Sequence, residues 1–313
     1  MELGGTFNLY ERSSFQLINS YIIDSKSSYG GIISAKEFTV ITIYNCTFTQ
    51  NYGDANLFDI IESSLSMENV TIKNNLNNLV LASRSIIVLK EILIKDHTCS
   101  IVSQGCIINA FGSSQITILS SVFENVQSLE RDNIFIHESS LNLSKVSFTL
   151  TTTQIKKGSC ISGIDSSVQI NYAYFSYFDG NAIYLENSAL SLSNSVVMDY
   201  GNTSKLAERN KFGALVCLDC FEITIENTSF VGNKGVKGAA IYLYDSGSIE
   251  SKAKCIIGGL FQGNEGEEKG GAVYLENQNI VIEEVSFNSN RAIDGGAIFC
   301  MLDGNSKITY ISF

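Results

Sequence analysis

Only a few groups in this sequence combine reactive residue types with a spacing that could do chemistry. Cys217-Leu-Asp-Cys220 offers two thiols that could bind a metal or form a redox disulfide. A zinc ribbon needs a second such pair, and a redox pair should open a helix, whereas this pair lies among strand-like residues. We therefore expect core or disulfide cysteines among all eight: Cys46, Cys99, Cys106, Cys160, Cys217, Cys220, Cys255 and Cys300.

The histidines and acidic clusters are the other candidates. His97 and His137 each stand beside one acidic residue, without a paired base, so we expect solvated turn or strand residues and predict no catalytic residue. Glu265, Glu267 and Glu268 could hold Ca²⁺ through carboxylate oxygens, but the EF-hand spacing is missing. A solvated acidic loop is favoured there, and no other metal ligand or cofactor is expected.

Five Asn-x-Ser/Thr sequons are candidate glycosylation sites. Asparagine is abundant in this chain, so sequons also arise by chance, and they give only modest support for secretion. Their asparagines are Asn45, Asn69, Asn142, Asn202 and Asn227.

Composition excludes several classes of protein. The 313 residues are 44% hydrophobic and 17% charged, which is not the composition of a disordered chain. A net charge of −11 argues against a nucleic-acid partner, which needs a positive field. No apolar run approaches the roughly 18–20 residues of a membrane span, and the first residues lack signal-peptide features. We expect one domain over 1–313, cut from a longer chain.

The elements that must position these groups follow a repeat. One unit reads Phe261-Gln-Gly-Asn264, then Gly270-Gly271-Ala272-Val273-Tyr274, and similar units recur at intervals of about 26 residues. Each unit contains three short alternating segments rich in Ile, Val, Phe and Tyr, bounded by Gly, Asn, Ser or Asp. The anchor residues of the twelve units are Ile22, Phe48, Ile72, Ile94, Phe123, Phe148, Phe175, Val197, Phe230, Phe261, Phe287 and Phe313.

This pattern predicts an all-β parallel β-solenoid of about 11–12 coils, with three short strands per coil. No stretch shows sustained helical periodicity. Equivalent residues of successive coils should stack about 4.8 Å apart, with the anchors in one inward file. The largest loops, around 201–211 and 245–256, are the expected lateral contacts.

An asparagine column accompanies the anchors. Its members lie three residues after an anchor, and we expect a structural role for two reasons. Asparagine tolerates the left-handed conformation of a sharp corner, and stacked amides can hydrogen-bond from coil to coil. The column consists of Asn51, Asn75, Asn233, Asn264 and Asn290.

A row of aromatic residues is the predicted contact stripe. Each follows an inward Ile or Val, so strand alternation would place the row outside, where an exposed aromatic column marks a partner or carbohydrate surface. The alternative is a stripe covered by a loop or a neighbouring chain. The row consists of Tyr184, Tyr242, Tyr274 and Phe299.

The alternation of Phe-x-x-Asn with Gly-Gly-Ala-Ile resembles the repeats of chlamydial polymorphic outer-membrane proteins and of related protist surface proteins. More broadly, the chain resembles the pectin-lyase-like superfamily. The paired motif is specific over 228–300 and degraded over 15–227. The resemblance implies right-handed coiling, an extracellular or cell-surface location, and adhesive or structural work.

The leading hypothesis is therefore a non-enzymatic structural or adhesive segment of a surface protein that assembles into a fibre. Its expected partners are protein, through self-association or lateral assembly, or surface glycans. One alternative is a polysaccharide lyase or glycoside hydrolase of the β-helix class, although the catalytic signatures of polygalacturonase-like members are missing. A second alternative is a carbohydrate-binding module that uses the aromatic stripe.

Overall fold

A computed structural model gives the fold of this chain. It describes residues 7–27, 31–99, 104–128, 132–149, 152–153, 158–178, 180–201, 212–247, 254–301 and 306–313. The chain divides into two compact units, 1–158 and 159–313, each of which is described by itself. Much of the two predicted contact loops, 202–211 and 248–253, lies outside the described residues.

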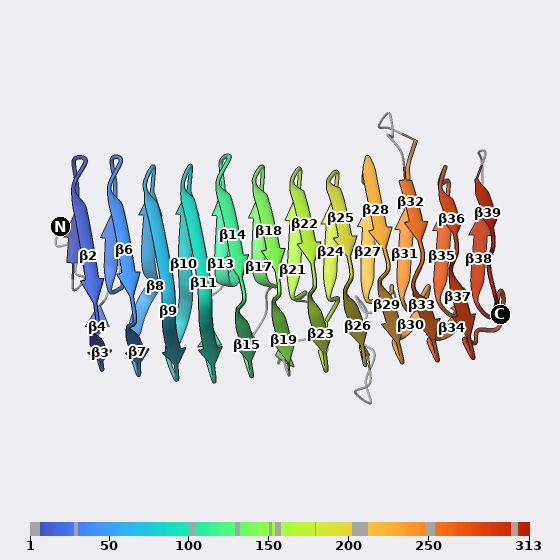
Figure 1. Cartoon of the computed structure of the whole chain (residues 1–313), viewed down its shortest axis with the longest axis horizontal. Helices are drawn as coiled ribbons and strands as arrows, with labels where there is room; N and C mark the ends of the chain where they lie inside the picture. The colour runs from blue at the N-terminus through green and yellow to red at the C-terminus, as the bar shows by residue number, and fades with distance from the viewer. Residues whose placement is uncertain are drawn as a thin grey trace. The chain divides into compact units, whose positions relative to one another are not determined.

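The first unit consists of parallel strands that pair between successive coils (Figure 1). One ladder contains β1 (Phe7–Leu9), β5 (Ile33–Ala35), β8 (Tyr52–Ile61), β10 (Leu76–Ser83), β13 (Gly105–Phe111) and β17 (Asp132–His137). The second contains β2 (Ser14–Ile18), β6 (Val40–Tyr44), β9 (Ser64–Lys73), β11 (Ile86–Lys95), β14 (Gln115–Leu119) and β18 (Ser140–Ser144). The third joins β3 (Tyr21–Ile23), β7 (Thr47–Thr49), the ends of β9 and β11, β15 (Val122–Glu124) and β19 (Ser147–Thr149). Short strands at the next corner are β4 (Lys26–Ser27), β12 (Thr98–Cys99), β16 (Gln127–Ser128) and β20 (Thr152–Thr153).

The second unit repeats this plan. Its first ladder contains β21 (Ile161–Ile164), β24 (Ile183–Glu186), β27 (Leu215–Leu218), β31 (Ile241–Tyr244), β35 (Val273–Glu276) and β38 (Ile298–Met301). Its second contains β22 (Ser167–Asn171), β25 (Ala189–Ser193), β28 (Glu222–Glu226), β32 (Lys254–Ile257), β36 (Val281–Glu283) and β39 (Lys307–Thr309). Its third contains β23 (Tyr174–Ser176), β26 (Val196–Met198), β29 (Ser229–Val231), β33 (Leu260–Gln262) and β37 (Ser286–Asn288), and β30 (Lys234–Lys237) pairs with β34 (Glu265–Lys269).

The predicted anchor register is present in both units. In the second unit Phe230 pairs with Phe261, and Phe261 pairs with Phe287. Both pairs of ring centroids are 5.0 Å apart, with interplanar angles of 11° and 19°. In the first unit Phe48 pairs with Ile72, which pairs with Ile94. The predicted all-β parallel solenoid, matching a right-handed β-helix, is confirmed.

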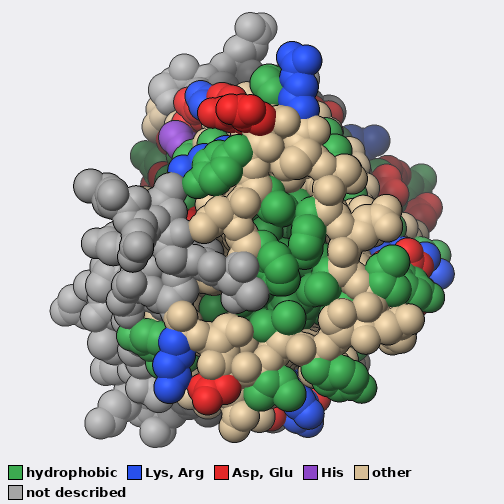
Figure 2. Space-filling view, turned by 90° about the vertical axis from the view of Figure 1, so that its left-hand side faces the viewer, with side chains coloured by type: hydrophobic (Ala, Val, Ile, Leu, Met, Phe, Trp, Pro, Cys, Tyr) green, Lys and Arg blue, Asp and Glu red, His purple; other side chains and the backbone are tan. Residues whose placement is uncertain are grey.

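The core is the inside of each coil. Strand residues alternate between buried and more exposed positions, as in β9 and β11, because one face of each strand points inward. Figure 2 looks onto the first unit from the left-hand side of Figure 1, and hydrophobic side chains fill the middle of that face. Backbone and other side chains border these hydrophobic side chains on that face (Figure 2).

The Gly-Gly pairs serve both backbone geometry and close approach. Gly270 has φ +63°, a left-handed conformation that glycine adopts without strain. Gly271 faces the next coil so closely that an added Cβ would lie 2.0 Å from the Gly296 carbonyl oxygen. The first glycine of this pair therefore serves the corner conformation, and the second is required by coil-to-coil packing.

Candidate functional site

The asparagine column forms hydrogen-bonded ladders inside both units. In the first unit, Asn51 donates from its backbone N and its Nδ2 to Asn75 Oδ1, at 2.8 and 2.9 Å. In the second, Asn233 donates in the same two ways to Asn264 Oδ1, at 3.1 and 2.9 Å. Asn264 then donates to Asn290 Oδ1, at 3.0 and 2.8 Å. The carboxamide oxygens of Asn75, Asn264 and Asn290 thus each accept two hydrogen bonds from the preceding coil.

These carboxamides have little capacity left for a ligand. Asn75 Nδ2 also donates to the Phe48 carbonyl at 2.9 Å, and Asn264 Nδ2 donates to the Phe230 carbonyl at 3.0 Å. The expected left-handed backbone at the column is wrong. The left-handed conformation belongs to the residue before each asparagine: Gln50, Asn74, Gly232, Gly263 and Ser289. The corner turns one residue earlier, which lets the asparagine side chain point inward.

A tyrosine ends the ladder in the second unit. Tyr200 lies three residues after the anchor Val197, and its backbone N donates to Asn233 Oδ1 at 3.2 Å. The side chain is fully buried, and its hydroxyl donates to the Phe212 carbonyl at 3.1 Å. Burial raises the pKa of the phenol above its ordinary value. Tyr200 thus stands where other coils of the ladder have asparagine, and its buried hydroxyl has a hydrogen-bond partner.

A histidine ends the ladder in the first unit. His97 lies three residues after the anchor Ile94, and its carbonyl accepts from Gln127 N at 2.8 Å, as Asn75 O accepts from Thr98 N. The expectation of a solvated His97 is wrong, because the ring is fully buried. Neither ring nitrogen makes a hydrogen bond of acceptable geometry. Burial lowers the pKa of His97 to about 4, and the nearby Asn77 backbone opposes that shift only in part.

The predicted aromatic stripe is a file, but it is covered. Tyr184, Val216, Tyr242, Tyr274 and Phe299 occupy equivalent positions of successive strands. Tyr242 and Tyr274 stack at 5.0 Å yet are only 6% and 2% exposed, and Tyr184 and Phe299 are half-buried. The expectation of an exposed contact stripe is therefore wrong, and the alternative of a covered stripe describes the structure.

The cover comes from Phe212 and from lysine side chains at the ends of β30 and β34, all of which precede the glycine corners. The Phe212 ring lies 4.2 Å from that of Tyr242. Lys237 Nζ lies 5.4 Å from the Tyr274 ring centroid, and Lys269 Nζ lies 4.5 Å from that of Phe299. Burial raises the pKa of Tyr242 to about 12, with a further contribution from the negative charge of Glu276. The stripe stabilises the outer side of the sheet rather than offering a flat sugar platform.

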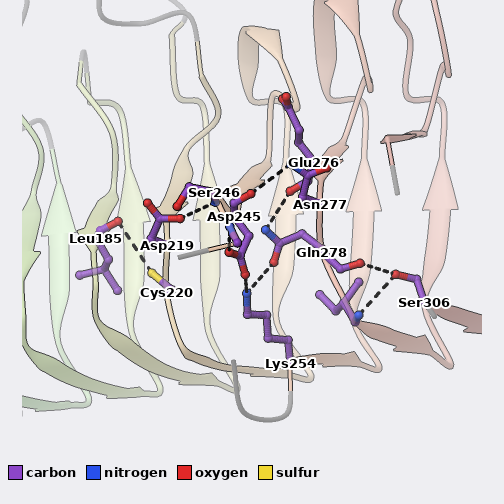
Figure 3. Close-up of polar contacts among 12 residues, drawn as sticks. Leu185, Asp219, Cys220, Asp245, Ser246, Lys254, Glu276, Asn277, Gln278 and Ser306 are labelled. Carbon is purple, nitrogen blue, oxygen red and sulfur yellow. Dashed lines mark hydrogen bonds and ion pairs between the residues drawn. The ribbon is translucent and has the colours of Figure 1, made fainter. Parts of the chain in front are cut away.

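A lysine occupies an aliphatic core position in the second unit (Figure 3). Lys254 pairs with Ile223 in the register and is fully buried. Its Nζ lies 2.8 Å from Asp245 Oδ2 and 2.9 Å from Gln278 Oε1. Asp245 Oδ1 in turn accepts from Gly247 N at 2.8 Å. The buried charge is thus paired and hydrogen-bonded, as a core lysine must be.

The Cys217-Leu-Asp-Cys220 pair lies in the core beside this network. Both residues are buried and neither is in a disulfide, which agrees with the expected core role. Burial, reinforced by the neighbouring Cys220 thiol, raises the pKa of Cys217, and nearby Lys254 opposes the shift only in part. Because the thiolate is the reactive form, this environment suppresses redox chemistry at Cys217.

The acidic cluster is used by ion pairs. Glu265 Oε1 lies 2.5 Å from Arg291 NH2, and Glu265 Oε2 lies 4.0 Å from Lys234 Nζ. Glu267 and Glu268 are exposed. Among the described residues these three carboxylates do not bring their oxygens together as a ligand group. Calcium binding at this strand stays a prediction.

The sequon asparagines that the structure describes are exposed: Asn45, Asn69, Asn142 and Asn227. Asn202 lies outside the described residues. Asn69 Nδ2 donates to Asn45 Oδ1 at 3.1 Å, and Asn45 Nδ2 donates to Asn19 Oδ1 at 2.7 Å. Attachment of a glycan at Asn45 would therefore compete with an outer amide ladder, and glycosylation stays a prediction.

An open groove of about 510 Å³ lies on the first unit. Phe38, Val40 and Ile86 line it and are 65%, 49% and 51% exposed. The Arg84–Glu62 ion pair also lines the groove, with NH2 and Oε1 2.5 Å apart. This surface combines exposed apolar side chains with a charged pair, and sequence periodicity gave no sign of it.

Comparison with known proteins finds one family repeat in a short part of the chain. A model of the Chlamydia polymorphic membrane protein repeat matches residues 284–301. The sequence has no match among curated proteins. No described helix is long and apolar enough to cross a membrane.

Solved structures show similarity of fold at low identity. The catalytic domain of a GH87 α-1,3-glucanase in complex with tetrasaccharides is 11% identical over 99% of this chain, with TM-score 0.42. The same class of domain in complex with nigerose gives 11% identity, 99% coverage and TM-score 0.37. The Agl-KA catalytic domain gives 12% identity, 92% coverage and TM-score 0.32. The chain spans 64%, 64% and 62% of the length of these structures.

Proposed function

We propose that this chain is a non-enzymatic structural and adhesive β-helix segment of an extracellular or cell-surface protein. One observation carries the proposal: the inward polar side chains of the Asn ladders are consumed by bonds between coils. Asn264, for example, accepts from Asn233 and donates to Asn290 and to the Phe230 carbonyl. Side chains committed in this way hold coils together and leave no free group to bind a substrate.

The repeat match supports the surface location. The Chlamydia polymorphic membrane protein repeat covers the coil that contains Phe287, Asn290 and the Gly295-Gly296 corner, which is the best-formed part of the repeat. The outer aromatic file supports a structural role as well. It is packed under Phe212 and lysine side chains, which removes the surface that a carbohydrate-binding module would use at this place.

The groove lined by Phe38 and Ile86 is the surface on which we would test adhesion. A Phe38→Ser plus Ile86→Ser variant removes two of the three exposed apolar side chains of the lining while leaving Val40 and the Arg84–Glu62 pair. Expected partners are a second copy of the chain, another surface protein or a surface glycan. Val40→Thr, on the same lining, is a milder matched control that keeps the β-branched shape.

The test of the class is turnover. Purified protein is incubated with a glycan panel that includes α-1,3-glucan and alginate, with detection of new reducing ends and unsaturated products. The proposal predicts no turnover above the heat-denatured protein. It also predicts fibres or laterally associated particles in electron micrographs of the native material. Robust cleavage of any glycan would overturn the non-enzymatic assignment, and discrete monomeric particles would overturn the fibre assignment.

A further inference from the structure

His97 places a polar side chain in the core of the first unit. The fold does not require a polar residue at this position. At the equivalent corner position the next coil has the apolar residue Val126, and the second unit has Phe178. Both are buried, so an apolar side chain is accepted there. His97 is fully buried, and neither ring nitrogen makes a hydrogen bond of acceptable geometry, although the Asn77 backbone lies close to the ring. A buried, unpaired imidazole costs stability, which points to a chemical use.

Two cysteines lie against this imidazole. Cys99, in β12, and Cys106, in β13, are 2% and 1% exposed and are joined by a disulfide. The ligand atoms of His97, Cys99 and Cys106 all lie within 4.8 Å of one another. No other set of three or more histidine, cysteine or acidic side chains in the described part of the chain converges in this way.

A further buried acceptor lies in the neighbouring coil. Asn78 Oδ1 is buried without a hydrogen-bond partner, although its Nδ2 donates to Asn56 Oδ1 at 3.3 Å. The carbonyl oxygen of the preceding residue, Asn77, lies 3.6 Å from Cys99 Sγ. The unpaired oxygen of Asn78 therefore belongs to the stretch of β10 that lies beside the disulfide.

One imidazole nitrogen and two thiolates form a donor set that suits Zn²⁺ and, among softer ions, Cu⁺. We propose that His97, Cys99 and Cys106 form a redox-gated zinc site: oxidised, the two sulfurs bind each other, and reduced, they bind Zn²⁺ together with His97. The three side chains leave one position of a tetrahedral site for water or for a neutral oxygen donor. This inference goes beyond the proposed function and is independent of it.

The chemistry balances with a thiol or phosphine reductant. With a thiol, two RSH molecules reduce the Cys99–Cys106 bond to two thiols and become one RS–SR. Zinc then replaces the two thiol protons, which are released to solvent, while the neutral imidazole of His97 donates a nitrogen lone pair. His97, Cys99 and Cys106 lie within ten residues of one another in the sequence, so binding would tie β12 to the start of β13.

The test uses the full chain in both redox states. A phosphine reductant is applied until thiol titration gives eight thiols instead of the six cysteines outside the disulfide. Zinc alone, and separately Co²⁺ as a spectroscopic probe, is titrated into reduced and oxidised protein. We expect one equivalent to bind to the reduced protein, with thiolate-to-cobalt charge-transfer absorption, release of two protons per zinc and a raised Tm. The oxidised protein should show none of these signals.

Three variants make the test specific. His97→Gln should weaken zinc binding more than about tenfold, because one ligand is lost while both thiols are kept. Cys99→Ser plus Cys106→Ser should abolish it. Cys217→Ser plus Cys220→Ser, at the other close cysteine pair, should leave it unchanged. Circular dichroism and urea unfolding verify that each variant is folded. The inference is overturned if reduced, folded protein binds no zinc, if His97→Gln binds as tightly as the parent, or if binding follows Cys217 and Cys220.

Discussion

The two units place unusual polar residues at inward positions and treat them differently. In the second unit, Tyr200 ends the asparagine ladder and Lys254 replaces an aliphatic residue, and both are fully hydrogen-bonded. In the first unit, His97 ends the ladder at the same repeat position, and its ring makes no hydrogen bond of acceptable geometry. The difference shows that a solenoid accepts a polar substitution when the neighbouring coils supply partners. Where the neighbouring coils supply no hydrogen-bond partner, the buried polar side chain lowers the free energy of unfolding unless a ligand binds to it.

Loss of a paired charge should give the largest effect. Lys254→Met leaves Asp245 buried without its cation, and we expect the free energy of unfolding to fall by about 3–5 kcal/mol in urea unfolding. His97→Leu loses no hydrogen bond and should be neutral or stabilising.

A double variant provides the control. Lys254→Met combined with Asp245→Leu removes both charges and should recover most of the loss, within about 1–2 kcal/mol of the parent. If Lys254→Met alone is as stable as the parent, the buried pair does not stabilise the second unit and the contrast with His97 is lost.

Acid should destabilise the disulfide-bonded protein through His97. The pKa of His97 is lowered from 6.5 to about 4 in the folded chain, so the unfolded chain binds a proton first as the pH falls. The part of the free energy of unfolding that depends on a neutral His97 is fully present above pH 6.5. It is lost as the pH falls from about 6.5 to 4, and the total loss is about 3 kcal/mol.

The comparison of parent with His97→Leu isolates this contribution from that of the carboxylates. We expect the parent to lose about 3 kcal/mol more than the variant over this range, measured by urea unfolding at each pH. Parallel pH profiles of the two proteins would show that His97 is solvated or paired, against the structure.

Breaking the ladder should cost more in the second unit than in the first. Asn264→Ala removes the hydrogen-bond partner of Asn233, of the Phe230 carbonyl and of Asn290. We expect the free energy of unfolding to fall by about 3 kcal/mol. Asn75 is bonded to Asn51 and Phe48 but has no asparagine after it, so Asn75→Ala should cost about 2 kcal/mol. Thermal melts of both variants test the order, and an equal or reversed order would contradict unequal ladders.

Extending the short ladder should give the smallest effect. His97→Asn places a carboxamide where the first unit interrupts its column, and we expect a gain of about 1 kcal/mol from a new acceptor for the Asn75 backbone N–H. Tyr200→Asn, the matched change in the second unit, should destabilise because it removes a large buried ring. If His97→Asn and Tyr200→Asn both stabilise the protein, or if neither does, the two ends of the ladders respond alike and the contrast between the units is wrong.

The sequence predicted the repeating features of this fold better than its exceptions. Phe230, Phe261 and Phe287 share one file because the same residue type recurs at a constant spacing, and a local pattern suffices to see it. The Asn ladder was predicted for the same reason, but its left-handed residue was misplaced by one. A corner conformation depends on the backbone of two adjacent coils, which no single unit reveals.

The candidate sites were harder to predict because they depend on contacts between coils. Lys254 and Asp245 are separated by a loop, and only the register shows that Lys254 replaces an aliphatic residue. The position of His97 three residues after Ile94 was available in the sequence as a signal, but its polarity favoured a solvated interpretation. The burial of Tyr242 and Tyr274 depends on Phe212 and Lys237, which lie outside the ladder of strands that carries the tyrosines, and periodicity does not describe such contacts.

The central claim is that inward carboxamides bind successive coils together. Its most direct test is the exchange of side-chain amide hydrogens measured by NMR. The account predicts that the Nδ2 hydrogens of Asn233 and Asn264 exchange as slowly as the backbone amides of the strands beside them, and far more slowly than those of exposed Asn69. Equal, rapid exchange at Asn233, Asn264 and Asn69 would contradict it.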